Sequence, residues 1–149
     1  MWDNKTNLLG FEATIQHDLI LWLKKSNRFH ITQKRDEADF ILDGSIFSIN
    51  QPALSYGEFD RATVLRAEVQ FAYNLTDQDT GKIVFRQARL LKRQDYSVSN
   101  DAVRTNSNLN KSLQLMSEDL ADSIYIQLFY LFTLDGSKGN KIIIPADDI

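Results

Sequence analysis

The residues most suggestive of a bound ligand are basic side chains in the middle of the chain. Four of them occupy one extended run of sequence, and the others lie just before or within the run that precedes it. A guanidinium group can bind a phosphate through two parallel hydrogen bonds, and an ammonium group binds it as a point charge. The candidate binding residues are Arg66, Arg86, Arg89, Lys92 and Arg93, with Arg61 nearby.

These basic residues also have a plainer explanation. Charged side chains keep a sheet surface solvated and protect an edge strand from pairing with another chain. Phosphate binding requires in addition that the side chains share one face. Arg89 and Arg93 are four residues apart, so strict alternation places them on the same side of a strand. A bulge near Gln87–Ala88 would separate them.

No other polar grouping has the spacing of a catalytic or metal site. His17 and His30 lie in different predicted elements, and neither has a second histidine at ligand spacing. Asp77 and Asp79 could begin a calcium loop, but the further oxygen ligands do not follow, so a turn explains them better. No serine lies in a nucleophile-elbow pattern, and the chain has no cysteine. We therefore predict a protein that is not an enzyme and holds no metal or cofactor.

Aromatic residues cluster near the end of the last predicted helix. Leu128 and Leu131 of that segment are expected to face the sheet, which leaves some of the rings without cover. An exposed apolar patch commonly marks contact with a protein or a membrane. Core packing and partner contact both stay open for these residues, which are Tyr125, Phe129, Tyr130 and Phe132.

The element that positions the basic residues is predicted to be a long hairpin. From Val64 to Leu75, apolar and polar residues alternate with few exceptions, which is the period of a strand with one buried face. Asp77–Lys82 supplies turn residues, including Gly81, which can take a positive φ. A second extended run follows at Lys82–Tyr96. The two runs should pair antiparallel, with one face buried and one face in water.

Amphipathic helices are predicted on both sides of this hairpin. Phe11–Lys25 carries apolar residues at spacings of three and four, and about Leu109–Leu131 does so with near-heptad spacing. The other predicted segments are a short strand at Phe29–Thr32, a strand at Ala38–Ile49 in which Gly44 indicates a bulge or close backbone approach, a loop at Asn50–Arg61, an irregular stretch at Val98–Ser107 and an extended tail at Lys141–Pro145.

Runs of strands flanked by helices predict an α+β fold. We expect a two-layer sandwich, with both helices packed on one face of a mainly antiparallel sheet of about four strands. The apolar side of the hairpin needs a cover, and the two helical stripes are the large ones available. The 149 residues should form one domain over residues 1–149, in which residues 135–149 are an extended tail. Trp2 reads as the end of a strand whose first part is missing, so the chain is expected to be trimmed at its N-terminus.

Composition narrows the class of protein. The chain is 43% hydrophobic and 25% charged, as in ordinary globular domains. Its net charge of -3 disfavours a general nucleic-acid binder. No run reaches the ~20 apolar residues of a membrane span, and no signal peptide is visible. The lack of cysteine excludes disulfides and leaves the cellular compartment open.

Several short motifs, in their order along the chain, resemble the LptE family of lipopolysaccharide-assembly lipoproteins. The resemblance covers roughly residues 3–131, and it rests on the joint order of motifs that consist mainly of turn residues and strand patterns. The family's lipidated cysteine and secretion signal are absent, and the apolar tail is longer than the family's. The motifs are Asn4-Lys5-Thr6, Glu37-Ala38-Asp39 through Leu42 to Gly44, Asp77 through Thr80-Gly81-Lys82, and Asp95-Tyr96 at a strand end.

The resemblance implies a function in the bacterial outer membrane. A protein of this family would sit on the periplasmic side, anchored through a lipid on a cysteine that this chain lacks. It would plug and help assemble the LptD β-barrel, which inserts lipopolysaccharide into the outer membrane, and it would bind lipopolysaccharide itself. The alternative is another periplasmic lipoprotein of similar build that regulates an envelope enzyme by protein contact.

Overall fold

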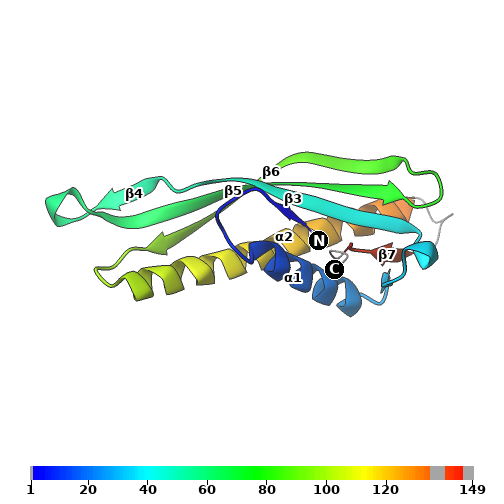
Figure 1. The fold of residues 1–149 in the computed structure, drawn as a ribbon, viewed down its shortest axis with the longest axis horizontal. Helices are drawn as coiled ribbons and strands as arrows, with labels where there is room; N and C mark the ends of the chain where they lie inside the picture. Colours follow the sequence, from blue (N-terminus) through cyan, green and yellow to red (C-terminus); the bar gives the residue numbers. More distant parts are fainter. Residues whose placement is uncertain (1, 135–139, 146–149) are drawn as a thin grey trace.

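Two helices lie against one face of a long, twisted sheet (Figure 1). The computed structural model of the chain describes residues 2–134 and 140–145. The elements are β1 (Asp3–Asn4), α1 (Phe11–Lys25), β2 (His30–Ile31), a 3-10 turn η1 (Arg35–Glu37), β3 (Phe40–Asn50), β4 (Ala53–Tyr56), a 3-10 turn η2 (Glu58–Asp60), β5 (Ala62–Asp77), β6 (Ile83–Ser97), α2 (Ala102–Leu134) and β7 (Lys141–Ile143).

The sheet is mixed and, in the described residues, has seven strands in the order β2-β7-β3-β5-β4, with β1 added to β3 and β6 added to β5. The long neighbours β3, β5 and β6 pair antiparallel, whereas β1–β3, β2–β7 and β3–β7 are parallel. The α+β class is confirmed, but the prediction of about four mainly antiparallel strands was wrong. The three parallel additions are two or three residues long, too short to show a period of their own.

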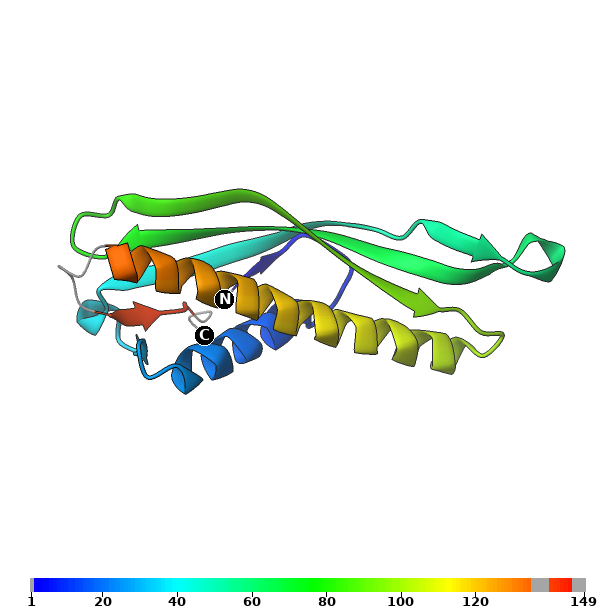
Figure 2. The same ribbon diagram turned by 180° about the vertical axis from the view of Figure 1, so that it is seen from behind.

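The buried residues of the core come from the sheet and from the two helices, which lie on one side of it (Figure 2). On β5, alternate residues from Ala67 to Leu75 are at most 4% exposed. The buried side of α1 is the apolar stripe that the sequence predicted, and its residues include Phe11, Ile15, Leu19 and Leu23. Both views show α1 and α2 on the same side of the sheet, as the apolar face of the hairpin requires. We call this side the helix face and the opposite side the open face.

Helix α2 begins at Ala102, and the prediction of an irregular stretch up to Ser107 was wrong. Its start is capped by Asp101, whose carboxylate accepts a hydrogen bond from the amide of Val103 at 2.9 Å. The first turns are polar and largely exposed, so they carry no apolar period. Capping chemistry, rather than hydrophobic pattern, sets this end of the helix.

The predicted loop at Asn50–Arg61 instead contains β4 and η2. Together with the first part of β5 they form a hairpin that extends beyond the helices (Figure 1). Phe59, in its turn, has a φ of 58° and is 89% exposed. A large apolar side chain in left-handed backbone is uncommon at an exposed position.

Gly44 permits the close approach of another group to the backbone of β3, which was one of the two predictions for this glycine; the other was a bulge. The indole of Trp2 lies over it, and a Cβ at this position would be 2.6 Å from the ring. Trp2 is only 2% exposed and leads directly into β1, which pairs with β3. The bulge of β3 lies elsewhere, between Ile46 and Ser48.

The turn between β5 and β6 is built by Asp77. Its carboxylate accepts hydrogen bonds from the amides of Asp79 and Thr80, at 2.9 and 3.2 Å. Gly81 has a φ of 70° and donates its amide to the Asp77 carbonyl. The acidic residues therefore form the turn that the sequence favoured over a calcium loop.

Within the predicted tail, Lys141–Ile143 forms the strand β7. Hydrogen bonds to Asp39 hold this strand in place. The carboxylate of Asp39 accepts the Lys141 amide at 2.9 Å, and the Lys141 carbonyl accepts the Asp39 amide. Ile142 and Ile143 are buried. Residues 135–139 and 146–149 of the predicted tail lie outside the described residues.

Candidate functional site

The predicted basic residues divide between the two faces of the sheet. Alternation along β5 is regular, so its odd-numbered residues from Leu65 to Leu75 line the helix face and Arg66 lies on the open face. Across the hairpin, Arg93 faces Glu68 and Arg86 faces Asn74, which puts both arginines on the open face. The structure therefore brings these three arginines to one surface, spread along the length of β5.

Two of these three arginines are already paired with carboxylates. Arg66 Nε donates to Asp95 Oδ1 at 2.8 Å, and this hydrogen bond holds the pKa of the Asp95 carboxyl below its usual range. Arg93 Nε lies 3.3 Å from Glu68 Oε1. Glu68 and Asp95 were not recognised in the sequence as partners, because the pairing depends on the register of the hairpin. These ion pairs reduce the positive charge available to a phosphate at this part of the open face.

The positive charges of Arg86 and Arg89 are less compensated by carboxylates than those of Arg66 and Arg93. Arg86 donates to the neutral amide oxygen of Asn74 at 3.3 Å. In the described residues, no ion pair is found for Arg89, which is exposed. A bulge on β6, at Ala88–Arg89, lies opposite Ala72. It adds one residue between Arg93 and Arg86, and for this reason the two share a face although they are seven apart.

Lys92 is not part of the open surface. It lies opposite Val69 on the helix face, and its side chain is 16% exposed. Its ammonium group donates to Ser123 Oγ at 2.7 Å and pairs with Asp119 at 2.9 Å, so it ties β6 to α2. Arg61, which follows η2, lies at the other end of β5 from Arg86 and Arg89. Neither residue joins them in a cluster.

The aromatic residues at the end of α2 are mostly packed together. Tyr125 contacts Trp22 and Phe29, with ring centroids 6.3 and 6.0 Å apart. Phe132 packs edge-on against Phe29 and Phe40. Phe129 joins the same cluster through Tyr125, and the guanidinium of Arg28 lies 4.2 Å from its ring centroid. Tyr130 is different, because it is 63% exposed.

The described residues contain no group of three or more histidine, cysteine, aspartate or glutamate side chains that could hold a metal ion. His17 and His30 are both exposed, one on α1 and one on β2. None of the helices, over the described ranges, has the length and apolar character needed to cross a membrane.

Comparison with solved structures supports the fold. The chain is similar to a protein from Caulobacter crescentus CB15, with 13% identity, a TM-score of 0.61 and coverage of 90% of this chain and 92% of that one. It is also similar to the rare lipoprotein B of Shewanella oneidensis (13% identity, TM-score 0.58, 89% and 95% covered) and to lipoprotein B of Nitrosomonas europaea (16% identity, TM-score 0.60, 91% and 83% covered). Identities this low show a common fold and no more.

Comparison with the curated proteins found no match. A family model does match, over residues 1–128, which include every element except the end of α2 and β7. Its description is LptE, lipopolysaccharide-assembly. The chain therefore belongs to the LptE family, as its motifs predicted.

Proposed function

We propose that this protein is a non-enzymatic outer-membrane component that plugs and helps assemble an LptD-like barrel and binds lipopolysaccharide. The observation that carries the proposal is the family match over residues 1–128. The fold is compatible with it, because the open face carries Arg66, Arg86 and Arg93 and neither α1 nor α2 covers that face (Figure 1). The protein would act on the periplasmic side of the outer membrane, held there by a lipid anchor.

Lipopolysaccharide binding is assigned to Arg86 on the open face and to Arg89 in the neighbouring bulge of β6. Phosphates on the lipid would meet two guanidinium groups that no carboxylate neutralises in the described residues. Arg66 and Arg93 are weaker candidates, because Asp95 and Glu68 already compensate them. Lys92 is excluded from this surface by its bonds to α2.

We expect Arg86→Glu combined with Arg89→Glu to weaken binding to purified lipopolysaccharide by about tenfold or more, since each charged hydrogen bond contributes roughly 1.5–3 kcal/mol. The parent's affinity should fall as salt is added, because exposed charges are screened over about 8 Å at physiological ionic strength. Lys24→Glu with Arg104→Glu is the control, since it changes net charge equally at exposed positions on the helices. Equal affinities of the two folded double variants across a salt series would exclude this surface.

The barrel-plug role is assigned to the exposed apolar residues at the two ends of the molecule. The β4–β5 hairpin carries Tyr56 and Phe59, which are 64% and 89% exposed, and α2 carries Tyr130 near its end. Exposed aromatic residues of this kind are common at protein interfaces.

A photo-reactive amino acid at Phe59 or Tyr130 is expected to cross-link to an LptD-like barrel in envelope membranes. The tagged parent protein should co-purify with the same barrel. Cross-links to an envelope enzyme, without any to a barrel, would favour the regulatory alternative. Failure of both the cross-links and the co-purification would contradict the plug role.

A further inference from the structure

The outer edge of β6 has no strand beside it in the described residues, where β6 pairs with β5 alone. The Val98 amide donates to the Thr63 carbonyl at 2.9 Å, so the backbone groups of Val98 point toward β5. Successive residues of an antiparallel strand turn these groups alternately toward and away from the neighbouring strand. The pairing with β5 has no bulge between Leu90 and Ser97. The backbone groups that point away from β5 are therefore those of Leu91, Arg93, Asp95 and Ser97.

Side chains of α2 occupy part of this edge. Ser112 Oγ donates to the Asp95 carbonyl at 3.2 Å, and the side-chain amide of Asn108 donates to the Ser97 carbonyl at 3.0 Å. The two donors are four helix residues apart, about 6 Å, and the two carbonyls are two strand residues apart, about 6.7 Å. An added strand would place its own amides at these carbonyls, so α2 stands where a neighbouring strand would pair.

A third residue of α2 continues this contact beyond the end of β6. Thr105 Oγ1 accepts the Ser99 amide at 2.9 Å and donates to the Ser99 carbonyl at 3.2 Å. We call the three side chains, which lie along one side of the helix, the polar stripe: Thr105, Asn108 and Ser112. Over the described ranges, α2 supplies no acceptor to the outward amides of Asp95 and Ser97. The edge therefore keeps donors that a strand could still use.

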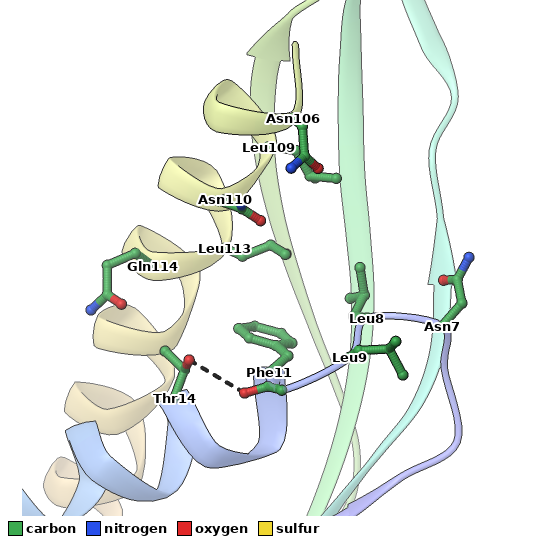
Figure 3. A pocket seen from close by; sticks show the side chains of 11 residues that line it. Asn7, Leu8, Leu9, Phe11, Thr14, Asn106, Leu109, Asn110, Leu113 and Gln114 are labelled. Carbon is green, nitrogen blue, oxygen red and sulfur yellow. Dashed lines mark hydrogen bonds between the residues drawn. The ribbon is translucent and has the colours of Figure 1, made fainter. Parts of the chain in front are cut away.

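The polar stripe holds turns of α2 that have little other anchorage. Val103 is 79% exposed, and before Ser112 only Leu109 of α2 packs against the core in the part of the chain that the structure describes. Figure 3 shows these turns from the groove that Asn106 and Asn110 line, beside the segment that precedes α1. Turns with so few buried contacts open locally far more readily than the whole protein unfolds. Their opening would uncover the edge of β6.

The uncovered edge is complementary to itself. If two copies pair antiparallel about Gln94, Arg93 of each copy lies opposite Asp95 of the other. Arg93 already pairs with Glu68, and Asp95 with Arg66, so the charges alternate across both copies. A shift of two residues would set Arg93 opposite Arg93 or Asp95 opposite Asp95, which is unfavourable. One register is therefore favoured, and in it the outward backbone groups of the two copies meet.

We propose that the outer edge of β6 is a pairing site for a second copy of this chain, and that the polar stripe blocks this site while the first turns of α2 are folded. A strand from another protein would meet the same backbone donors, but a second copy necessarily brings the matching charges. The helix thus acts as an internal cover that keeps two sheets from joining. The inference goes beyond the lipid and barrel roles and does not depend on them.

The test removes the polar stripe and measures the oligomeric state by analytical ultracentrifugation over a range of protein concentrations. The stripe variant combines Thr105→Ala, Asn108→Ala and Ser112→Ala. Its dimer should have a Kd at least tenfold below that of the parent, because the edge is freed without breaking the hydrogen bonds of the stripe. The control variant should behave like the parent, since it places three alanines at exposed positions of the same turns: Asn106→Ala, Ser107→Ala and Asn110→Ala.

A second variant opens the same turns with the side chains of the stripe intact. Asn106→Pro removes a helix hydrogen bond and clashes with the preceding turn, so it should also promote dimers. Ser97→Pro, added to a variant that dimerises, should abolish the dimer. The Ser97 amide points outward, so proline costs no bond to β5 but cannot donate to a second copy.

Cysteine substitutions in the stripe variant report the register, since the chain has no other cysteine. Gln94→Cys should give a disulfide-linked dimer on mild oxidation, because Gln94 faces Gln94 of the second copy. Ser97→Cys should not, because in this register Ser97 lies opposite Leu91.

Three results would each overturn the proposal. The first is that neither the stripe variant nor Asn106→Pro dimerises more strongly than the parent and the control variant. The second is that Ser97→Pro leaves the dimer intact, which would place the association on another surface. The third is that Ser97→Cys cross-links as readily as Gln94→Cys. Circular dichroism confirms that each variant is folded.

Discussion

Tyr73 is a residue whose environment predicts a dependence of stability on pH. It lies on the helix face, is 4% exposed, and burial raises its pKa to about 12. An unfolded tyrosine ionises near pH 10. Below that pH both states keep the proton, so the contribution to stability is fully present there. Between pH 10 and 12 the unfolded state loses its proton first, and the folded state is destabilised.

We therefore expect the free energy of unfolding to fall by about 2–3 kcal/mol between pH 10 and 12, since one pKa unit corresponds to about 1.36 kcal/mol. Tyr73→Phe should remove this part of the pH dependence, because phenylalanine does not titrate. Denaturant unfolding of both proteins at each pH measures the difference between their free energies of unfolding. The titration of lysines and of Tyr96 is common to the two proteins and cancels in this difference. Parallel stability curves for the two proteins would show that the Tyr73 phenol is not protected.

At the scale of elements, the central hairpin determines which residues face which. Leu75 is 1% exposed and lies between Leu42 and Phe85, whereas the next residue back, Asn74, faces Arg86 on the open side. A shift of one residue along a strand exchanges the two faces.

Leu75→Asp should destabilise the protein by several kcal/mol, comparable to the whole stability of a domain, because it buries an unpaired carboxylate and removes a core side chain. Asn74→Asp should change stability by no more than about 0.5 kcal/mol, since it places a carboxylate beside Arg86 at the surface. Thermal melts of the two variants compare them directly. A similar loss in both would contradict the assignment of the faces.

The same hairpin shows how far the sequence predicts the site. Composition and alternation predicted both strands of the hairpin and α1 closely, because each has a clear period. The register was not predictable in the same way. At the turn Asp77 bonds to Lys82, and an unbroken ladder from there would set Arg93 opposite Arg66. Two bulges on β6 shift the register, so that each arginine meets a carboxylate instead.

The parallel pairing of the short strands and the start of α2 were not predicted, for a related reason. Each is fixed by contacts between residues that are distant in sequence or by a single capping group. Asp39 holds β7 from a hundred residues away, and Asp101 caps α2 at a point where the first turns of the helix are exposed. The local order of polar and apolar residues does not reveal such contacts, whereas it does reveal the apolar stripes of amphipathic helices and strands.

At the scale of the whole molecule, the elements at one end are packed against fewer neighbouring elements than those at the other. The β4–β5 hairpin and the first turns of α2 project beyond α1 at the same end (Figure 2). In α2 the buried residues begin at Ser112, and those before it are exposed or half-buried. Elements with few buried contacts open locally at a free energy well below that of global unfolding.

Hydrogen exchange should therefore divide α2 into two parts. We expect amides at 105–110 to exchange faster than those at 116–128 by about two orders of magnitude or more, because local opening is sufficient for the first part. Amides of the β4–β5 hairpin should exchange with the first part. Uniform protection along α2 would contradict this division. If the projecting end enters a barrel, addition of the purified barrel should slow exchange at both projecting elements together and leave 116–128 unchanged.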